Sequence, residues 1–396
     1  MGKGKRTQNH RAATGKTARE EADRRTNIIN LTMVTAFVLA LAVGFVFLRG
    51  LQLPCVQVLT VDGFEMNAVM FNYFYRDTYD SFQNAYGELL DAYGTIDDSR
   101  PLDEQVYSED FTWADFFYDT TLQTAQRTVI VYQAALQAGY ELSESGAAAV
   151  ADELEAVQTG AKQNGFVTPG SFVRSHYGKG AGMSSYEQYL LLKELAEEYS
   201  TASYADAEYT DSEMEAWYRE NYPDADGEHE YNTVNCRLIY LPYSGYAYDE
   251  ELGYYGYSEE TREYTMDQLK TITADYMALS PGEQTEEAFA ALAREYSSYQ
   301  AEEGGLYQNA YKGDSGLETQ VQTWLFGNRS AGDVGYVSAD SGAYLLYWLG
   351  EDIPAWEYLA LQGLRNDTWN EWYLSLSADA MVEASPKILS YLNLDP

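Results

Sequence analysis

The 396-residue chain contains very few of the residues from which metal and redox sites are built. Its two cysteines, Cys55 and Cys236, lie 181 positions apart, which is the spacing of neither a zinc site nor a C-x-x-C redox pair. The three histidines, His10, His176 and His229, are scattered along the chain. We therefore expect no metal site, no cofactor and no catalytic triad. A disulfide between the two cysteines stays open if they lie outside the cell.

Basic residues are scarce outside the N-terminal region. Residues 1–50 contain nine Lys or Arg and three acidic residues, whereas the rest of the chain contains 16 and 59, for formal charges of about +6 and −43. So negative a surface repels phosphate backbones, which excludes nucleic-acid binding by the main body. Hydrophobic residues make up 45% of the chain and tyrosines number 37, so we expect a folded core with the acidic residues on its surface.

One long apolar run lies near the N-terminus, where Leu31–Leu48 carries no charge. As a helix this run would span about 27 Å, close to the hydrocarbon thickness of a bilayer. Eight basic residues precede it, so the positive-inside rule places the N-terminus in the cytoplasm. We expect a cytoplasmic basic tail over 1–27, a transmembrane signal anchor over 28–50 and an extracytoplasmic main body, which makes a single-pass plasma-membrane protein.

Two other fates of this apolar run stay open. Cleavage as a signal peptide would need a shorter apolar region and a small-residue cleavage site, which residues 51–55 (LQLPC) do not provide. Lipidation of Cys55 would need a small residue where Pro54 stands. The uncleaved anchor is the interpretation that fits the residues best.

Apolar periodicity indicates a mostly helical region after the anchor. A short strand is expected at Val56–Val61, followed by a turn at Asp62-Gly63. The expected helices cover residues 64–93, 111–138, 143–164, 172–178, 184–199 and 210–221. Within 184–199 the tyrosines and leucines form one broad stripe, which we interpret as helix core.

The composition changes after residue 229. Strands are expected at 234–241 and 341–349, with a Tyr-, Gly- and Glu-rich loop over 242–264. Between them, helices are expected at 265–279, 286–296 and 320–326, and helix returns over 355–394. The expected fold class is therefore α+β and mostly α.

Five segments in the α+β region resemble, in order, those of a parvulin-type peptidyl-prolyl isomerase domain. Residues 289–297 (FAALAREYS) resemble the family's FxxLAxxYS helix end, and 304–306 (GGL) resemble its Gly-Gly turn. Residues 316–326 (GLETQVQTWLF) are similar to its G-x-M-x-x-x-F-x-x-A-x-F segment. Residues 331–334 and 341–346 are similar to the turn and the last strand that follow. The resemblance implies a parvulin-like domain over 229–351.

The flanking regions resemble the extracytoplasmic foldases of the PrsA and SurA type. The similar features are the tethered start, the strand and D-G turn before a long helix, the segment 172–178, and 209–221 (YTDSEMEAWYREN). The resemblance implies a SurA-N-like helical chaperone domain over 56–228, completed by C-terminal helices over 352–396. It also implies that the partners are unfolded or proline-containing secreted polypeptides, and it leaves a homodimer open.

The family's site residues are substituted in this sequence. The resemblance places its catalytic positions at Arg237, Tyr299 and Tyr344, so both usual histidines are absent. It places the substrate-binding pocket at Leu317, Val321 and Phe326. Because prolyl isomerisation breaks no covalent bond, an apolar pocket that twists the amide could still serve. Three functions stay open: a chaperone with a degenerate parvulin-like domain, an active isomerase acting on secreted proteins, and a structural envelope protein that docks a partner.

Overall fold

The computed structural model describes residues 50–93, 95–205, 207–225, 227–249 and 254–396. The expected cytoplasmic tail and, except for Gly50, the expected anchor over 28–50 lie outside these residues. Within the described ranges, no helix combines the length and the apolar character needed to cross a bilayer. The described part is α+β with a majority of helix, as the sequence predicts.

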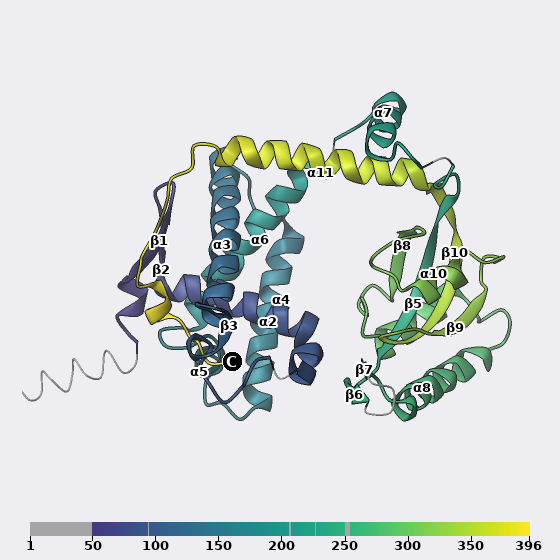
Figure 1. The fold of residues 1–396 in the computed structure, drawn as a ribbon, viewed down its shortest axis with the longest axis horizontal. Coiled ribbons are helices and arrows are strands. Elements are labelled where there is room, and N and C mark those ends of the chain that lie inside the picture. Colours follow the sequence, from purple (N-terminus) through teal and green to yellow (C-terminus); the bar gives the residue numbers. More distant parts are fainter. Residues whose placement is uncertain (1–49, 94, 206, 226, 250–253) are drawn as a thin grey trace, which may run out of the picture.

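The N-terminal lobe is a set of helices beside a small antiparallel sheet of strand order β11-β1-β2 (Figure 1). Strands β1 (Gln57–Val61) and β2 (Phe64–Asn67) form a hairpin whose turn residues, Asp62 and Gly63, both have positive φ. Strand β11 (Val382–Ala384) pairs with β1, with Leu59 opposite Ala384. The expectation of helix over 355–394 is therefore wrong after residue 377, because this segment fills the free edge of β1.

The helices of this lobe begin and end at residues with clear local signals. Thr112, Thr168 and Thr210 each form a capping box, and the Ser143 side chain accepts a hydrogen bond from the Gly146 amide. Gly139 ends its helix in the left-handed conformation. The helices are α2 (Ala68–Tyr93), α3 (Trp113–Ala138), α4 (Glu144–Gln163), α5 (Pro169–Tyr177), α6 (Met183–Ala205) and α7 (Asp211–Asn221). Short elements accompany them: η1 (Leu53–Cys55), η2 (Leu102–Glu104), β3 (Val106–Ser108), β4 (Phe111–Thr112) and η3 (Ile388–Tyr391).

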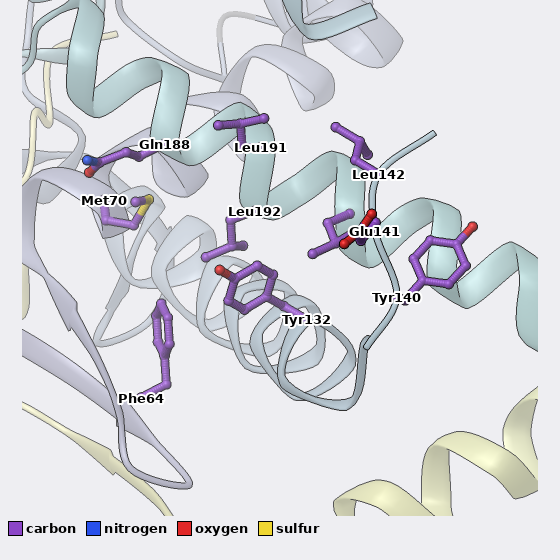
Figure 2. Close-up of a pocket in the computed structure, with 10 residues that line it drawn as sticks. Phe64, Met70, Tyr132, Tyr140, Glu141, Leu142, Gln188, Leu191 and Leu192 are labelled. Carbon is purple, nitrogen blue, oxygen red and sulfur yellow. The ribbon is translucent and has the colours of Figure 1, made fainter. Parts of the chain in front are cut away.

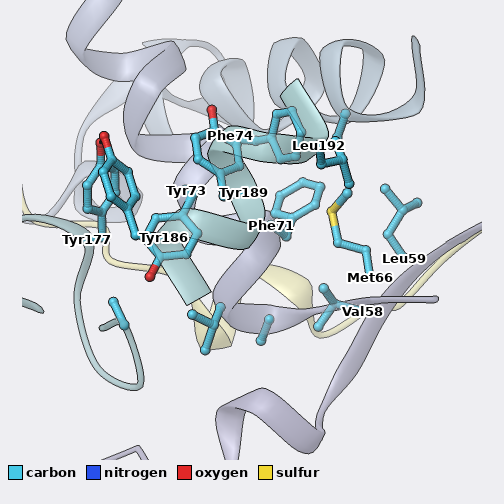
Figure 3. Close-up of a cluster of buried hydrophobic side chains, with 14 of the residues drawn as sticks. Val58, Leu59, Met66, Phe71, Tyr73, Phe74, Tyr177, Tyr186, Tyr189 and Leu192 are labelled. Atoms are coloured by element: carbon cyan, nitrogen blue, oxygen red, sulfur yellow. The ribbon is translucent and has the colours of Figure 1, made fainter. Parts of the chain in front are cut away.

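Tyrosines build much of the core of this lobe (Figure 3). Tyr73 is fully buried and stacks on Tyr189 with ring centroids 5.3 Å apart. The Asp77 carboxylate accepts hydrogen bonds from the hydroxyls of Tyr189 and Tyr177, at 2.5 and 3.1 Å. Burial of Tyr186 and Tyr189 confirms that the stripe on 184–199 belongs to the core.

The second lobe contains a four-stranded antiparallel sheet of order β8-β5-β10-β9. Its strands are β5 (Asn232–Pro242), β8 (Leu306–Ala310), β9 (Val334–Ser338) and β10 (Gly342–Pro354). Helices α8 (Glu259–Met277) and α9 (Glu286–Tyr296) pack on one face, and α10 (Thr319–Leu325) packs on the other. Within the expected loop 242–264, β6 (Ala247–Asp249) and β7 (Tyr254–Gly256) form a hairpin.

The Gly-Gly turn joins α9 to β8 and requires its glycines. Gly305 has a φ of +66°, and a Cβ there would lie 2.0 Å from the carbonyl oxygen of Leu238. The Gly305 carbonyl in turn accepts a hydrogen bond from the Leu238 amide at 2.7 Å. The turn therefore extends the pairing of β5 beyond β8 as far as Leu238, and only glycine allows the two backbones to approach so closely.

Helix α11 (Ala355–Ser377) follows β10 directly and connects the two lobes (Figure 1). Near its middle, the Trp217 indole of α7 donates a hydrogen bond to Asp367 at 2.7 Å. Further along, the Trp369 indole donates to the Ser200 hydroxyl at 2.7 Å, and Arg127 lies 3.9 Å from the Trp369 ring. One helix therefore contacts both α7 and the α3–α6 face of the N-terminal lobe.

Candidate functional site

The six residues that the parvulin resemblance nominates do not share one face of the sheet. Side chains alternate along a strand, so Cys236 and Arg237 point to opposite faces of β5. Cys236 packs against Leu317 and Val321 on the α10 side. Arg237 pairs across the sheet with Tyr347, which lies in the cluster beneath α8 and α9.

Arg237 holds secondary structure together on its own face. Its Nε donates to the Glu286 carboxylate at 2.9 Å, at the start of α9. Its Nη1 donates to the carbonyl oxygens of Glu303 and Gly304, at 2.8 and 3.0 Å. The structure therefore places Arg237 on the α8–α9 face, away from the other five nominated residues, whereas the neighbouring Cys236 lies on the α10 face. The alternation of apolar and polar residues along 234–238 (VNCRL) is the sequence signal that could have shown that Cys236 and Arg237 face opposite sides of the sheet.

Three of the nominated residues meet on the α10 face and pack in one cluster, and they are Leu317, Val321 and Tyr344. Val321 is fully buried and Leu317 is 6% exposed. The Tyr344 ring stacks on Tyr240 with centroids 4.7 Å apart, and its hydroxyl donates to Glu318 at 3.0 Å. Burial, with this carboxylate nearby, raises the pKa of Tyr344, so its hydroxyl stays protonated.

Phe326 and Tyr299 lie at the margin of the same cluster. The Phe326 ring meets the Tyr231 ring edge-on at 5.3 Å, and the Tyr299 ring lies 6.0 Å from Tyr307.

Burial raises the pKa of the Cys236 thiol to about 12, so this cysteine is not a thiolate nucleophile at neutral pH. Both cysteines are free, with Cys55 exposed in the N-terminal lobe, so the disulfide left open is not formed.

A different part of the molecule offers open apolar space. A cavity of about 480 Å³ lies in the N-terminal lobe, where β2, α3 and α6 meet (Figure 2). Phe64 and Tyr132 meet edge-on at 5.9 Å and form one wall, and Leu192 extends from α6 toward them. The residues around this cavity are Phe64, Met70, Tyr132, Tyr140, Glu141, Leu142, Gln188, Leu191, Leu192 and Leu195.

The chain between α3 and α4 shapes one rim of this cavity. Gly139 turns the backbone, and Tyr140 packs against Tyr199 of α6 with centroids 5.3 Å apart. The Ser143 amide then donates to the Glu198 carboxylate at 3.0 Å, which fixes the segment carrying Leu142 on α6. The rim is therefore held by hydrogen bonds while the interior stays apolar.

The chemistry of this cavity suits binding of apolar groups. Eight of its ten lining residues are aromatic or aliphatic, and Leu191 at its opening is 41% exposed. Glu141 and Gln188 are the polar members. Sequence reasoning missed this site, although three consecutive leucines at 190–192 cannot all face one side of a helix. One of the three had to lie outside the core.

No protein-family model matches the chain, and no curated protein matches it. Solved structures to which the chain is similar include PrsA from Bacillus subtilis, at 14% identity over 69% of this chain and 90% of that one, with a TM-score of 0.34. The foldase PrsA from Streptococcus pneumoniae is 14% identical over 72% and 96%, with a TM-score of 0.29. A SurA-like chaperone of Campylobacter jejuni is 12% identical over 84% and 99%, also with a TM-score of 0.29. The names of these proteins, PrsA and SurA-like chaperone, are those of the foldase type that the flanking sequence resembles.

Proposed function

We propose that this chain is a membrane-tethered holdase that binds apolar segments of unfolded, exported polypeptides. The observation that carries the proposal is the 480 Å³ apolar cavity of the N-terminal lobe, which opens beside the exposed side chain of Leu191. In other proteins, pockets with volumes of this order bind drug-sized ligands. An apolar segment leaving water for this cavity gains about 25 cal/mol per Å² of buried surface.

Two properties of the sequence support this role outside the cytoplasm. The apolar run at Leu31–Leu48, with basic residues before it, would tether the body close to the place where exported chains emerge. The strong negative charge of the remainder would keep complexes with bound clients apart from one another. On this proposal residues 56–228 and 352–396 form the client-binding lobe.

Residues 229–351 act, on the same proposal, as a degenerate parvulin-like domain. Two of the three expected pocket residues, Leu317 and Val321, are buried as core, and Tyr344, at an expected catalytic position, is hydrogen-bonded to Glu318. The domain would then hold α11 in place without catalysing isomerisation.

The test is suppression of client aggregation, measured by light scattering with the full chain in a nonionic detergent. The client is a chemically unfolded model protein diluted into buffer. We expect Leu191→Glu to lose most of the suppression, because a carboxylate at the opening must be desolvated when an apolar segment binds. Mass measurement by light scattering under the same conditions reports whether the chain is a homodimer.

The matched control is Leu374→Glu. Leu374 is 64% exposed on α11 and does not line the cavity, so the substitution adds the same charge elsewhere. We expect Leu374→Glu to retain the activity of the unchanged protein. Equal suppression by both variants, or no suppression by the unchanged protein at an equimolar ratio, would show that the cavity is not a client site.

A further inference from the structure

A second cavity lies in the other lobe, between the sheet and α11, and nothing above assigns it a role. Its volume is about 430 Å³. The sheet side contributes the segment after α9, strand β8 and the loop that follows, and α11 contributes its first two turns. The lining residues are Tyr299, Gln300, Glu303, Leu306, Tyr307, Gln308, Tyr311, Asp314, Tyr358, Leu359 and Gln362.

Four tyrosine rings form the walls of this cavity. Tyr299 and Tyr307 lie with ring centroids 6.0 Å apart and ring planes inclined by 31°. Tyr311 and Tyr358 also lie 6.0 Å apart, inclined by 50°, and Tyr358 belongs to α11. Aromatic faces carry the negative part of the ring quadrupole, so a space between such faces favours a cation.

A buried carboxylate lies among these rings. Asp314 is 9% exposed, and its oxygens accept hydrogen bonds from the Gly316 amide at 2.9 Å and the Tyr307 hydroxyl at 2.8 Å. Over the described ranges of the chain, no Lys, Arg or His nitrogen lies within 4.0 Å of it. Its near neighbour Lys312 instead lies 4.4 Å from the Tyr231 ring. The carboxylate therefore has hydrogen-bond donors and no cationic partner.

The tyrosines themselves do not compensate this charge. Burial raises the pKa of Tyr311 and Tyr358, and the nearby Asp314 raises the pKa of both further. The rings therefore stay neutral at physiological pH, with intact hydroxyls. Exposed Glu303 adds a second carboxylate to the lining, so the cavity is negative overall.

We infer that this cavity binds an alkylammonium cation, with the four tyrosine faces around the cationic group and Asp314 as its counter-ion. A buried carboxylate without a cation is costly, and an ammonium group brought beside it relieves that cost. Aromatic walls suit an alkylated nitrogen better than a bare metal ion, because its weakly hydrated methylene or methyl groups contact the rings. The inference does not depend on the holdase proposal, since the two cavities share no residue.

Two sources of such a cation differ in substitution at nitrogen. A lysine side chain of a bound polypeptide carries a primary ammonium, whereas a free choline-type ligand carries a quaternary one. Titrations of the full chain, in a nonionic sugar detergent, with N-acetyl-lysine amide and with choline separate the two sources. Tyrosine chemical shifts or fluorescence report binding, and sodium chloride keeps the ionic strength constant.

The uncharged control is 3,3-dimethyl-1-butanol, which has the shape of choline with carbon in place of nitrogen. We expect at least one of the two cations to bind about tenfold more tightly than this alcohol, as the cation–π and charge contributions require. Equal binding of the alcohol and both cations, or no saturable binding of either cation, overturns the inference.

Substitutions then place the cation in this cavity. We expect Asp314→Asn, which keeps the size of the side chain, to weaken cation binding about fivefold to tenfold. Tyr358→Leu should weaken it severalfold, whereas Tyr358→Phe should leave it nearly unchanged because the ring face remains. If Asp314→Asn fails to fold, the Tyr358 pair still decides, since equal binding by Tyr358→Leu and Tyr358→Phe contradicts the proposed site.

Discussion

At the contact between α7 and α11, the effect of Gly363→Ala on stability should depend on Trp217. The substitution should be destabilising when the Trp217 ring is present and stabilising when it is absent. Gly363 lies in the interior of α11, where glycine normally costs about 1 kcal/mol relative to alanine. Here the face of the helix at Gly363 is occupied, because a Cβ would lie 2.0 Å from Cζ2 and 2.1 Å from Cη2 of the Trp217 ring. We therefore predict that Gly363→Ala destabilises the docking of α7 although it improves helix propensity.

The expected magnitude follows from the two opposing contributions. Displacing the half-buried Trp217 ring forfeits roughly 2–4 kcal/mol of packing, and the gain in helix propensity returns about 1 kcal/mol. The indole of Trp217 would also lose its 2.7 Å hydrogen bond to Asp367. The net loss should be about 1–3 kcal/mol in the local stability of α7.

Amide hydrogen exchange, followed by mass spectrometry on the full chain in nonionic detergent, measures this local stability. We expect faster exchange in α7 for Gly363→Ala. In the Trp217→Ala background the clash is gone, so the same substitution should stabilise α11 by about 0.5–1 kcal/mol. Gly87→Ala in α2 is the matched control, because the nearest atom to its Cβ, at 3.4 Å, belongs to the flexible Gln83 side chain. Slower exchange for Gly363→Ala with Trp217 present would refute the reasoning.

The remaining predictions concern the sheet of the second lobe. In a protease-coupled assay on X-Pro peptides, the full chain should not accelerate isomerisation above the uncatalysed rate, since Leu317 and Val321 are packed as core. If the chain did accelerate isomerisation and Val321→Ala abolished the effect, the degenerate-domain proposal would be contradicted. The pKa of the Cys236 thiol is about 12 in the folded protein and 9.0 in its usual environment. Above pH 9 the thiol therefore ionises in the unfolded chain but not in the folded one, which favours unfolding. The stability that the buried, neutral thiol contributes is thus complete below pH 9 and is lost as pH rises toward 12. The difference in unfolding free energy between the unchanged protein and Cys236→Ala should therefore shrink over that window, and a pH-independent difference would show that Cys236 does not titrate there. Iodoacetamide should label Cys55 in the folded chain and Cys236 only after unfolding.

Local signals in the sequence determine most of the helices. Thr210 followed by Glu213 makes a capping box, and Gly139 supplies a left-handed helix end, so the boundaries of α7 and α3 could be predicted closely. Helix α9 also occupies the predicted residues, Glu286–Tyr296. These features depend on residues three or four positions apart, which a single sequence displays directly.

Long-range pairing was the part that the sequence could not display. Strand β11 is only three residues long, and it is a strand because β1, more than 300 positions earlier in the chain, has a free edge. The resemblance assigns Arg237 to a site position, but which face of the sheet its side chain occupies depends on the pairing of β5 with β10. The apolar cavity depends on how β2, α3 and α6 are placed around it, so its residues share no motif.

The position of α11 separates the two proposed sites in a way that can be measured. Tyr358 and Gln362, in its first turns, form one side of the tyrosine-lined cavity, whereas Trp369 docks its later turns on Ser200 of α6. The apolar cavity contains no residue of α11. Tyr358→Leu, a change on α11, should therefore weaken cation binding more than it weakens suppression of aggregation. Leu191→Glu should do the opposite, so the pair of variants assigns each activity to its own cavity.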